Sequence, residues 1–186
     1  MLEKILRKKA AILDTCLIAK AKDYSHTQEY FDQFFSILKK YDCIPLIHDL
    51  ITFEFFRGCK TQAHKKTKEE FLKLLSIEPL PVTKDDVDRA IVIANIYSNC
   101  NIPGTQISLV DCVNSALLER YGSSLVLVTT DINDYPLCLH DRFHVEVVDT
   151  KKEIINIGFF TFDKEAFRER LHGFESTEFL KSAKKD

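Results

Sequence analysis

Short apolar runs alternate with amphipathic segments along this chain of 186 residues, and this alternation constrains the fold more than any other feature. Residues 9–14, 43–46 and 124–131 have the length and composition of buried strands. The longer segments between them carry apolar side chains at helical spacing. Strands interleaved with helices predict an α/β fold in three layers, with a mostly parallel central sheet between two layers of helices.

Helix signals flank the apolar runs. Helices are expected over residues 24–41, 48–58, 83–100 and 108–122, with a further amphipathic segment over residues 59–75. Thr83 with Asp86, and Ser108 with Asp111, have the spacing of capping boxes at two of these helix starts. Residues 101–106 are expected to form a loop, because they contain a Pro-Gly pair.

The last part of the chain extends beyond this pattern. A strand is expected over residues 143–149 and an extra edge strand over residues 153–162, followed by a helix that starts at Asp163 and a frayed lysine-rich tail. We therefore expect residues 1–149 to form one domain and residues 150–186 to form an extension that packs on it. A hydrophobic content of 45% is enough for one core in a chain of this length.

Charge and cysteine usage narrow the class of protein. The formal net charge of −2 argues against bulk-charge coating of nucleic acid, although it permits local basic patches. Asp14 interrupts the apolar N-terminal region, and no run approaches the roughly 18 to 20 residues that span a bilayer, so we expect a cytoplasmic protein without membrane contact. The six cysteines form no C-x-x-C pair and therefore indicate no zinc ribbon.

Four acids lie where ligands of an α/β sheet collect. Asp14 and Asp131 follow expected strands, Glu54 lies in the helix after the second strand, and Asp111 lies in the first turn of a later helix. Because ligands bind beyond the carboxyl ends of parallel strands, these acids could converge on one pocket. Each acid also has a plain structural reading: a helix cap for Asp14 and Asp111, an exposed helix position for Glu54, and a turn for Asp131.

The ordered combination of motifs resembles a known family. Four segments occur in the family's order: "ILDTCLI", "LITFEFFRG", "ISLVDCVNSALLERYG" and "LVTTDINDYP". They resemble the PIN-domain family of metal-dependent ribonucleases, particularly the toxin half of bacterial and archaeal toxin–antitoxin pairs. The resemblance covers about residues 9–149, and its weight lies in the ordered co-occurrence of motifs that are individually weak.

This resemblance implies a PIN-like fold and a set of site residues. The four acids named above correspond to the family's catalytic and metal-binding positions, and Asp134 and Tyr135 correspond to its acid–aromatic ending. The sequence departs from the family at Cys16, where a small polar residue is common, and in the extension after residue 149. The resemblance further implies RNA as the substrate, and an antitoxin protein or a second copy of the chain as a candidate partner.

Phosphodiester hydrolysis explains the need for acids. A divalent cation lowers the pKa of its bound water and neutralises the charge that builds on phosphorus. Mg²⁺, or Mn²⁺ in the same site, prefers oxygen ligands and takes only one or two carboxylates directly. We assign Asp14 and Asp111 as direct ligands. Glu54 would bind through water or orient the attacking water, and Asp131 would be an outer ligand or hold a second ion.

Auxiliary candidates surround these acids. Thr15, Asn114 and Thr130 can hydrogen-bond the carboxylates or the scissile phosphate, although threonine equally fits plain strand and turn positions. Asp134 is a further auxiliary acid. A basic segment, residues 57–68, either steers RNA toward the acids or is a solvated loop and helix start. Its basic residues are Arg57, Lys60, Lys65, Lys66 and Lys68. Two uses, partner binding and core packing, are open for the phenylalanines Phe31, Phe34, Phe35, Phe53 and Phe56.

These residues are compatible with three candidate functions. The leading one is a metal-dependent endoribonuclease that acts as the toxin of a toxin–antitoxin module. The second is a catalytically inactive PIN-like module that binds RNA or protein, against which the four intact acids count. The third is a phosphatase of the haloacid-dehalogenase type, which would need a second Asp where this chain has Cys16.

Overall fold

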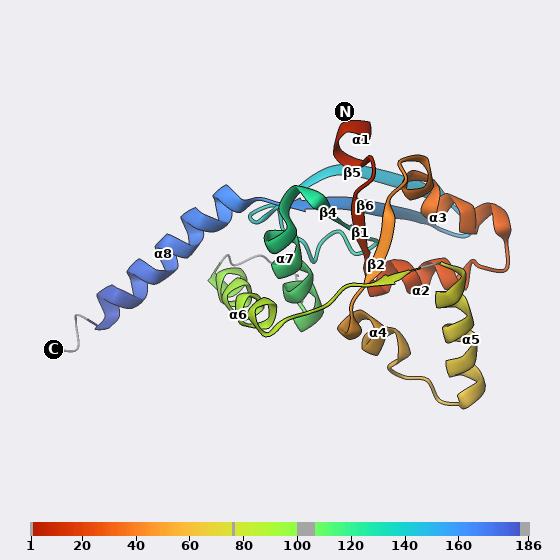
Figure 1. Ribbon diagram of the computed structural model, residues 1–186, viewed down its shortest axis with the longest axis horizontal. Helices are drawn as coiled ribbons and strands as arrows, with labels where there is room; N and C mark the ends of the chain where they lie inside the picture. Colours follow the sequence, from red (N-terminus) through yellow and green to blue (C-terminus); the bar gives the residue numbers. More distant parts are fainter. Residues whose placement is uncertain (1, 76, 100–106, 183–186) are drawn as a thin grey trace.

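A single sheet organises the structure. The computed structural model describes residues 2–75, 77–99 and 107–182, with side chains described up to residue 173. Within these residues the strands pair in the order β3-β2-β1-β4-β6-β5 (Figure 1). Their bounds are β1 (Ala10–Leu13), β2 (Ile44–Ile47), β3 (Glu78–Pro79), β4 (Leu125–Thr129), β5 (His140–Asp149) and β6 (Ile154–Phe162). The pairs among β3, β2, β1 and β4 are parallel, and β6 runs antiparallel to both β4 and β5.

Helices fill the connections from β1 to β4, and one further helix precedes β1 and another follows β6. Their bounds are α1 (Leu2–Leu6), α2 (Thr15–Asp23), α3 (Gln28–Lys40), α4 (Asp49–Phe56), α5 (Gln62–Leu74), α6 (Lys84–Asn99), α7 (Leu109–Tyr121) and α8 (Lys164–Ser182). The helix expected over residues 24–41 starts later, at Gln28. A separate helix, α2, begins directly after Asp14, and residues 24–27 form the turn between α2 and α3. Both predicted capping pairs form at the starts of α6 and α7. The loop expected over residues 101–106 lies outside the described residues.

The central strands carry the core. Ala11, Ile12 and Leu13 of β1 are fully buried, and so is every residue from Val126 to Thr129 of β4. Consecutive side chains of a strand point to opposite faces, so this continuous burial requires cover on both faces of the sheet. The α/β class with a mostly parallel sheet is therefore confirmed, and the burial fits a three-layer arrangement.

The prediction of an edge strand over residues 153–162 is wrong. The strand β6 lies between β4 and β5, and β5 is the edge of the sheet. The physical reason is continuous burial from Ile157 to Phe160, which only an interior strand provides. Gly158 belongs to this run because a Cβ atom there would lie 2.7 Å from the side chain of Ile132. The sheet thus holds the loop after β4 closely against β6.

The last helix leaves the body of the molecule. Phe167 of α8 is buried against Phe162, and Arg89 of α6 lies over its ring, so the first turns pack on the domain. Figure 1 shows the rest of α8 projecting away from the sheet. None of the helices in the described residues is long and apolar enough to cross a membrane.

Candidate functional site

Three neighbouring parallel strands end at one edge of the sheet, and each delivers a polar side chain there. Asp14 follows β1, Thr129 ends β4, and His48 follows β2. Asp14 is 5% exposed, His48 is 1% exposed and Thr129 is fully buried. This edge is the one at which α/β sheets bind ligands, as the sequence predicted for Asp14.

Asp14 is fixed by four donors. Its Oδ1 atom accepts a hydrogen bond from the backbone N–H of Thr15 at 2.8 Å, which makes Asp14 the N-cap of α2. Its Oδ2 atom accepts from the hydroxyl of Thr129 at 2.8 Å, from the thiol of Cys16 at 3.3 Å and from the hydroxyl of Tyr135 at 3.5 Å. The helix-cap reading of Asp14 is therefore correct for Oδ1, but two of the donors to Oδ2, Thr129 and Tyr135, come from distant parts of the chain.

Tyr135 joins Asp14 to Asp111. The Tyr135 hydroxyl donates to Oδ1 of Asp111 at 3.0 Å and lies 3.5 Å from Oδ2 of Asp14. Asp111 also accepts from the backbone N–H of Ser108 at 2.7 Å, as its capping box requires. Because a phenol carries one proton, two carboxylates share a single donor at this point. Burial and the charges of both acids raise the pKa of Tyr135 well above 10.0, so the phenol keeps that proton.

A buried chain of hydrogen bonds sets the direction of that proton. The Nε2–H group of His48 donates to Oδ1 of Asn114 at 2.8 Å, and Nδ2 of Asn114 donates to the Tyr135 hydroxyl at 2.9 Å. The oxygen of Tyr135 is thus occupied as an acceptor, and its proton is left for the acids. Burial lowers the pKa of His48, and its Nδ1 atom has no hydrogen-bond partner among the described residues, which fits a neutral ring with the proton on Nε2.

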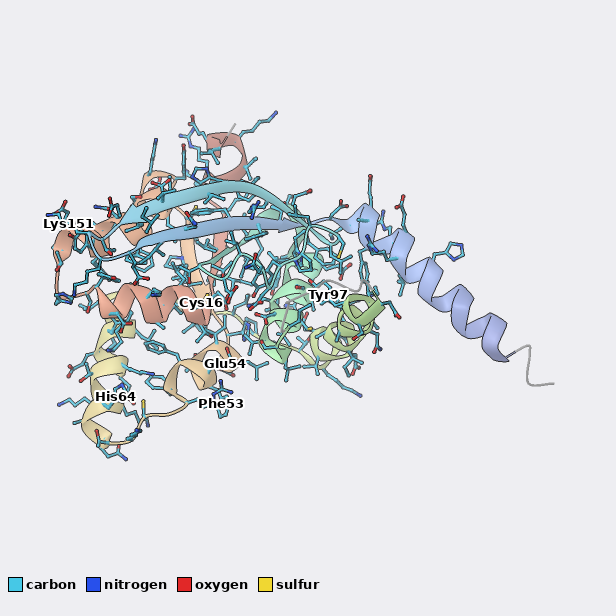
Figure 2. The ribbon with its side chains drawn as sticks, turned by 180° about the vertical axis from the view of Figure 1, so that it is seen from behind. Cys16, Phe53, Glu54, His64, Tyr97 and Lys151 are labelled. Atoms are coloured by element: carbon cyan, nitrogen blue, oxygen red, sulfur yellow. The ribbon has the colours of Figure 1, made fainter. Side chains whose placement is uncertain are left out.

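Glu54 reaches the same place from α4. Its Oε2 atom accepts a hydrogen bond from the Thr15 hydroxyl at 2.9 Å. Its charge also raises the pKa of Asp111, after the larger effect of burial. Figure 2 shows Glu54 on α4 together with Cys16 on α2, and the preceding residue, Phe53, is 63% exposed. Glu54 is therefore the member of α4 that faces the acids.

Asp131 and Asp134 lie at the outer side of the site. The backbone N–H of Asp131 donates to the hydroxyl of Thr129 at 3.0 Å, which holds the turn against β4. Burial, then the charges of Asp111, Asp131 and Asp14, raise the pKa of Asp134 to about 7. Asp131 itself is exposed. The loop after β4 thus adds two acids, one of them half-buried.

The electrostatics of the acids show mutual repulsion. Burial and then the charge of Asp111 raise the pKa of Asp14 from 3.8 to about 6, although three hydrogen bonds oppose this. The pKa of Asp111 is raised chiefly by burial. Each carboxylate is thus more costly to ionise in the folded protein than in water. A bound cation would remove this cost.

Cys16 fills the position at which the sequence departs from the PIN-domain pattern that it resembles. Burial, then the charge of Asp14, raise the pKa of the Cys16 thiol to about 12, so the thiol stays protonated. It donates to Asp14 and lies 3.0 Å from the hydroxyl of Thr129. A small hydroxyl residue would make the same contacts, so this departure leaves the site intact.

The donor set fits Mg²⁺ or Mn²⁺. In the part of the chain that the structure describes, no three His, Cys, Asp or Glu side chains could hold a metal ion as they stand. Mg²⁺ does not need such a group, because it usually takes one or two carboxylates and completes its octahedron with water and substrate oxygens. Asp14 and Asp111 are two hard oxygen donors that already share one hydroxyl proton. These two residues would hold the ion.

The auxiliary polar residues differ in whether they contact a carboxylate. Thr15 binds Glu54, and Asn114 binds Tyr135 and His48 but no carboxylate. The threonine hydroxyl that contacts Asp14 belongs to Thr129. Thr130, the residue chosen from the sequence, lies beside the thiol of Cys16. A threonine at the end of a buried strand points its side chain opposite to that of its neighbour, and the sequence did not reveal which of the two faces the acids.

The basic segment is largely paired. Lys65 and Lys66 form ion pairs with Glu69 and Glu70, which lie one turn later in α5. The ammonium group of Lys68 donates to the carbonyl oxygen of Phe55 and lies 4.6 Å from the centre of its ring. Arg57 and Lys60 are exposed between α4 and α5. RNA binding by the five basic residues stays a prediction.

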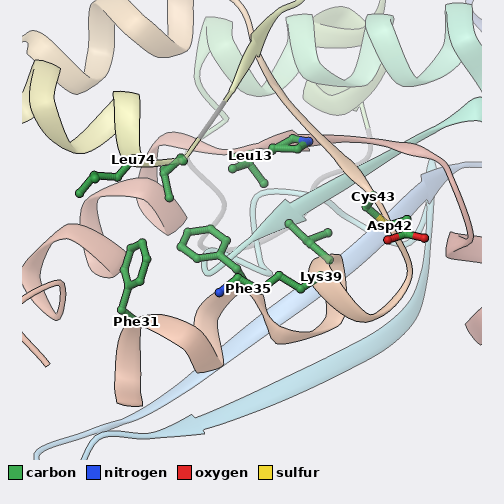
Figure 3. Close-up of a pocket in the computed structure, with 10 residues that line it drawn as sticks. Leu13, Phe31, Phe35, Lys39, Asp42, Cys43 and Leu74 are labelled. Atoms are coloured by element: carbon green, nitrogen blue, oxygen red, sulfur yellow. The ribbon is translucent and has the colours of Figure 1, made fainter. Parts of the chain in front are cut away.

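The phenylalanines divide between core and surface. Phe34 and Phe35 are buried, and Phe31 and Phe56 are half-buried. A cavity of about 450 Å³ lies between α3, β2 and the end of α5, and Figure 3 shows Phe31, Phe35 and Leu74 around it. Core packing thus accounts for Phe34 and Phe35. Partner binding stays a prediction for the exposed Phe53.

Comparisons with known proteins leave the family open. A scan against protein-family models gives no match, and a search of curated proteins gives none either. The resemblance to PIN domains therefore rests on the residues of this chain alone.

Tyr135→Phe is expected to lower both the stability of the protein and its affinity for Mn²⁺. The change removes the donor shared by Asp14 and Asp111 and leaves Nδ2 of Asn114 without its acceptor, which should cost about 1–3 kcal/mol of stability. Affinity for Mn²⁺ should fall roughly 10–100-fold, as for other residues that orient ligands. Calorimetric Mn²⁺ titration measures this.

The matched control is Tyr97→Phe. The Tyr97 hydroxyl is also buried, but it contacts Ser115 and His140 instead of the acids. If the two variants bind Mn²⁺ with equal affinity, then Tyr135 does not orient the carboxylates that hold the ion.

Proposed function

We propose that this protein is a metal-dependent endoribonuclease of the PIN type that hydrolyses RNA phosphodiester bonds, and that it acts as the toxin of a toxin–antitoxin module. One observation carries the proposal. Acids from three separate elements, Asp14, Glu54 and Asp111, act on one another at the carboxyl edge of the sheet and share the donors Thr15 and Tyr135. Helix caps alone have no reason to converge in this way.

The chain's own residues prepare the site for hydrolysis. A bound Mg²⁺ or Mn²⁺ would supply a water of lowered pKa and would neutralise charge on the phosphate. Asp14 and Asp111 would hold the ion. Glu54 has one carboxylate oxygen on Thr15, and the other oxygen is available to orient a water molecule. His48 and Asn114 keep the proton of Tyr135 directed at the acids, and thereby fix their orientation.

The alternative function is an inactive PIN-like module that binds RNA or protein. Such a module would keep the fold and the basic segment but would gain nothing from buried acids with raised pKa values. Buried, repelling carboxylates lower stability, so their presence favours catalysis over binding alone.

Asp111→Asn tests the proposal. We expect wild-type protein to cut single-stranded RNA in the presence of Mg²⁺ or Mn²⁺ but not in EDTA, and Asp111→Asn to lose roughly a thousandfold in rate. Cleavage is followed on an end-labelled oligonucleotide. The active chain should also halt growth of a bacterial host, and the variant should not.

The matched control breaks the same capping box from its other side. Ser108→Ala removes the hydroxyl that accepts from the backbone of Asp111 but keeps the carboxylate, at a cost of about 1 kcal/mol of stability. The proposal requires Ser108→Ala to remain active. Equal loss in both variants would show that Asp111 is only a cap, and absence of cleavage by wild type with either metal would favour the inactive module.

A further inference from the structure

A second hollow opens directly beside the acids. It lies between α2, the loop after β4 and the start of β6, and has a volume of about 630 Å³. Small-ligand sites span roughly 300–1,000 Å³, so the hollow has room for a ligand. Cys16 and Asp131 line it, and both also belong to the acidic site. We call this hollow the α2–β6 cleft.

The walls of the α2–β6 cleft are tied together. The ammonium group of Lys20 on α2 binds both carboxylate oxygens of Glu153 at 2.8 and 2.9 Å. The hydroxyl of Tyr24 donates to the same carboxylate at 2.8 Å and accepts from Thr150 at 3.1 Å. The turn between β5 and β6 is therefore fastened to α2. The C-terminal extension supplies one preformed wall of the cleft.

The charge of the cleft decides which part of an RNA could enter it. Asp23, Asp131 and Glu153 line it, and its one lining cation in the described residues, Lys20, is already paired with Glu153. A phosphate would be repelled by this excess of negative charge. The occupant must therefore be an uncharged part of the ligand.

The remaining lining suits a flat ring with polar edges. Ile154 is 68% exposed and, with Ile132, offers apolar surface for the faces of a ring. Asn133 and Asn156 are exposed and offer amide groups that both donate and accept hydrogen bonds. A nucleobase has this combination of an apolar face and a polar edge.

We propose that the α2–β6 cleft binds the nucleobase next to the phosphate that is cut, and that it selects cytosine and adenine over uracil and hypoxanthine. The inference rests on the proposed ribonuclease function, because the cleft adjoins the acids at Asp131 and Cys16. The carboxylate oxygens of Asp23 and Asp131 line the cleft as hydrogen-bond acceptors, so they favour the amino groups of cytosine and adenine. Uracil and hypoxanthine present a carbonyl oxygen at the same place and should be rejected.

Nucleosides without a phosphate test the cleft independently of cleavage. Cytidine and uridine form one matched pair, and adenosine and inosine form a second, because the members of each pair differ only in an amino group exchanged for a carbonyl oxygen and in the proton on the neighbouring ring nitrogen. Titration of the wild-type chain, followed by NMR of the asparagine side-chain amides, should show saturable shifts of Asn133 and Asn156 with cytidine and adenosine. Affinity for uridine and inosine should be about fivefold to tenfold lower, which is the effect of one hydrogen bond.

Variants separate the cleft from the rest of the surface. Asn133→Ala and Asn156→Ala should each weaken cytidine binding about fivefold and reduce the base preference of RNA cutting to a similar extent. Asn95→Ala, an exposed asparagine of α6 outside the cleft, should change neither. Because Asn133 and Asn156 are exposed and lie on different elements, loss of fold in both variants is not expected.

The outcomes distinguish this inference from the proposed function. Equal binding of cytidine and uridine, with unchanged cutting sites in Asn133→Ala and Asn156→Ala, would overturn the base cleft and leave the ribonuclease in place. Amino-selective nucleoside binding by a chain that cuts no RNA with either metal would support the cleft and overturn the ribonuclease.

Discussion

Asp14→Asn is expected to abolish metal-dependent RNA cleavage while making the metal-free protein more stable at pH 8. The rate should fall roughly a thousandfold, because a direct metal ligand is lost. Stability should rise by up to about 3 kcal/mol, because an asparagine carries no charge to be buried beside Asp111. Asparagine also caps helices as well as aspartate does, so α2 keeps its N-cap. Single-turnover cleavage and urea unfolding in EDTA measure the two effects.

The control for Asp14→Asn is Asp163→Asn. Asp163 precedes α8 and accepts hydrogen bonds from the backbone N–H groups of Glu165 and Ala166, so it is an aspartate cap with no other acid described as a partner. Its replacement should leave cleavage unchanged and stability within about 1 kcal/mol. If both variants behave alike, in activity and in stability, then Asp14 is only a cap and the account fails.

The contribution of Asp14 and Asp134 to the stability of the metal-free protein is expected to fall as the pH rises from 4 to 8, while the lowered pKa values of His140 and His48 act in the opposite direction below pH 6.5. The pKa of Asp14 rises from 3.8 to about 6 on folding and that of Asp134 to about 7, so the folded chain binds protons that the unfolded chain releases. Their stabilising effect is complete below pH 3.8 and is lost as the pH passes through about 6 and then about 7. The part due to Asp14 is at most about 3 kcal/mol, or roughly 5–10 °C in melting temperature.

Divalent metal should reverse this loss. Mn²⁺ competes with protons for the carboxylates, so it should raise the melting temperature more at pH 8 than at pH 5. Thermal unfolding in EDTA and in Mn²⁺ across this range, for wild type and Asp14→Asn, isolates the contribution of Asp14. Parallel pH profiles for the two proteins, with no effect of metal on either, would contradict the proposed ionisation of the site.

The positions of the four main acids were accessible from the sequence because the rule behind them is local. An acid directly after a buried strand, such as Asp14, must lie at the carboxyl edge whatever the rest of the fold does. The pairing of Ser108 with Asp111 was equally local, since a capping box spans one turn. The same argument would have pointed to His48, which follows β2 as Asp14 follows β1.

What the sequence left open depends on contacts between distant segments. The hydrogen bonds that run from His48 through Asn114 to Tyr135 join three distant segments, and no rule of sequence spacing connects these residues. The interior position of β6, by contrast, could have been predicted from the sequence. The run around Gly158 is apolar on both faces, as in an interior strand, while β5 mixes exposed and buried residues as an edge does.

In the proposed site, Asp14 and Asp111 would hold one divalent cation at the carboxyl edge of the sheet. Anomalous diffraction from crystals of the wild-type protein grown with Mn²⁺ tests this claim most directly. The account predicts a manganese peak in contact with the carboxylates of Asp14 and Asp111, and no peak there in Asp14→Asn. A crystal saturated with Mn²⁺ in which those two carboxylates bind only Tyr135, Thr129 and their helix N–H groups would contradict it.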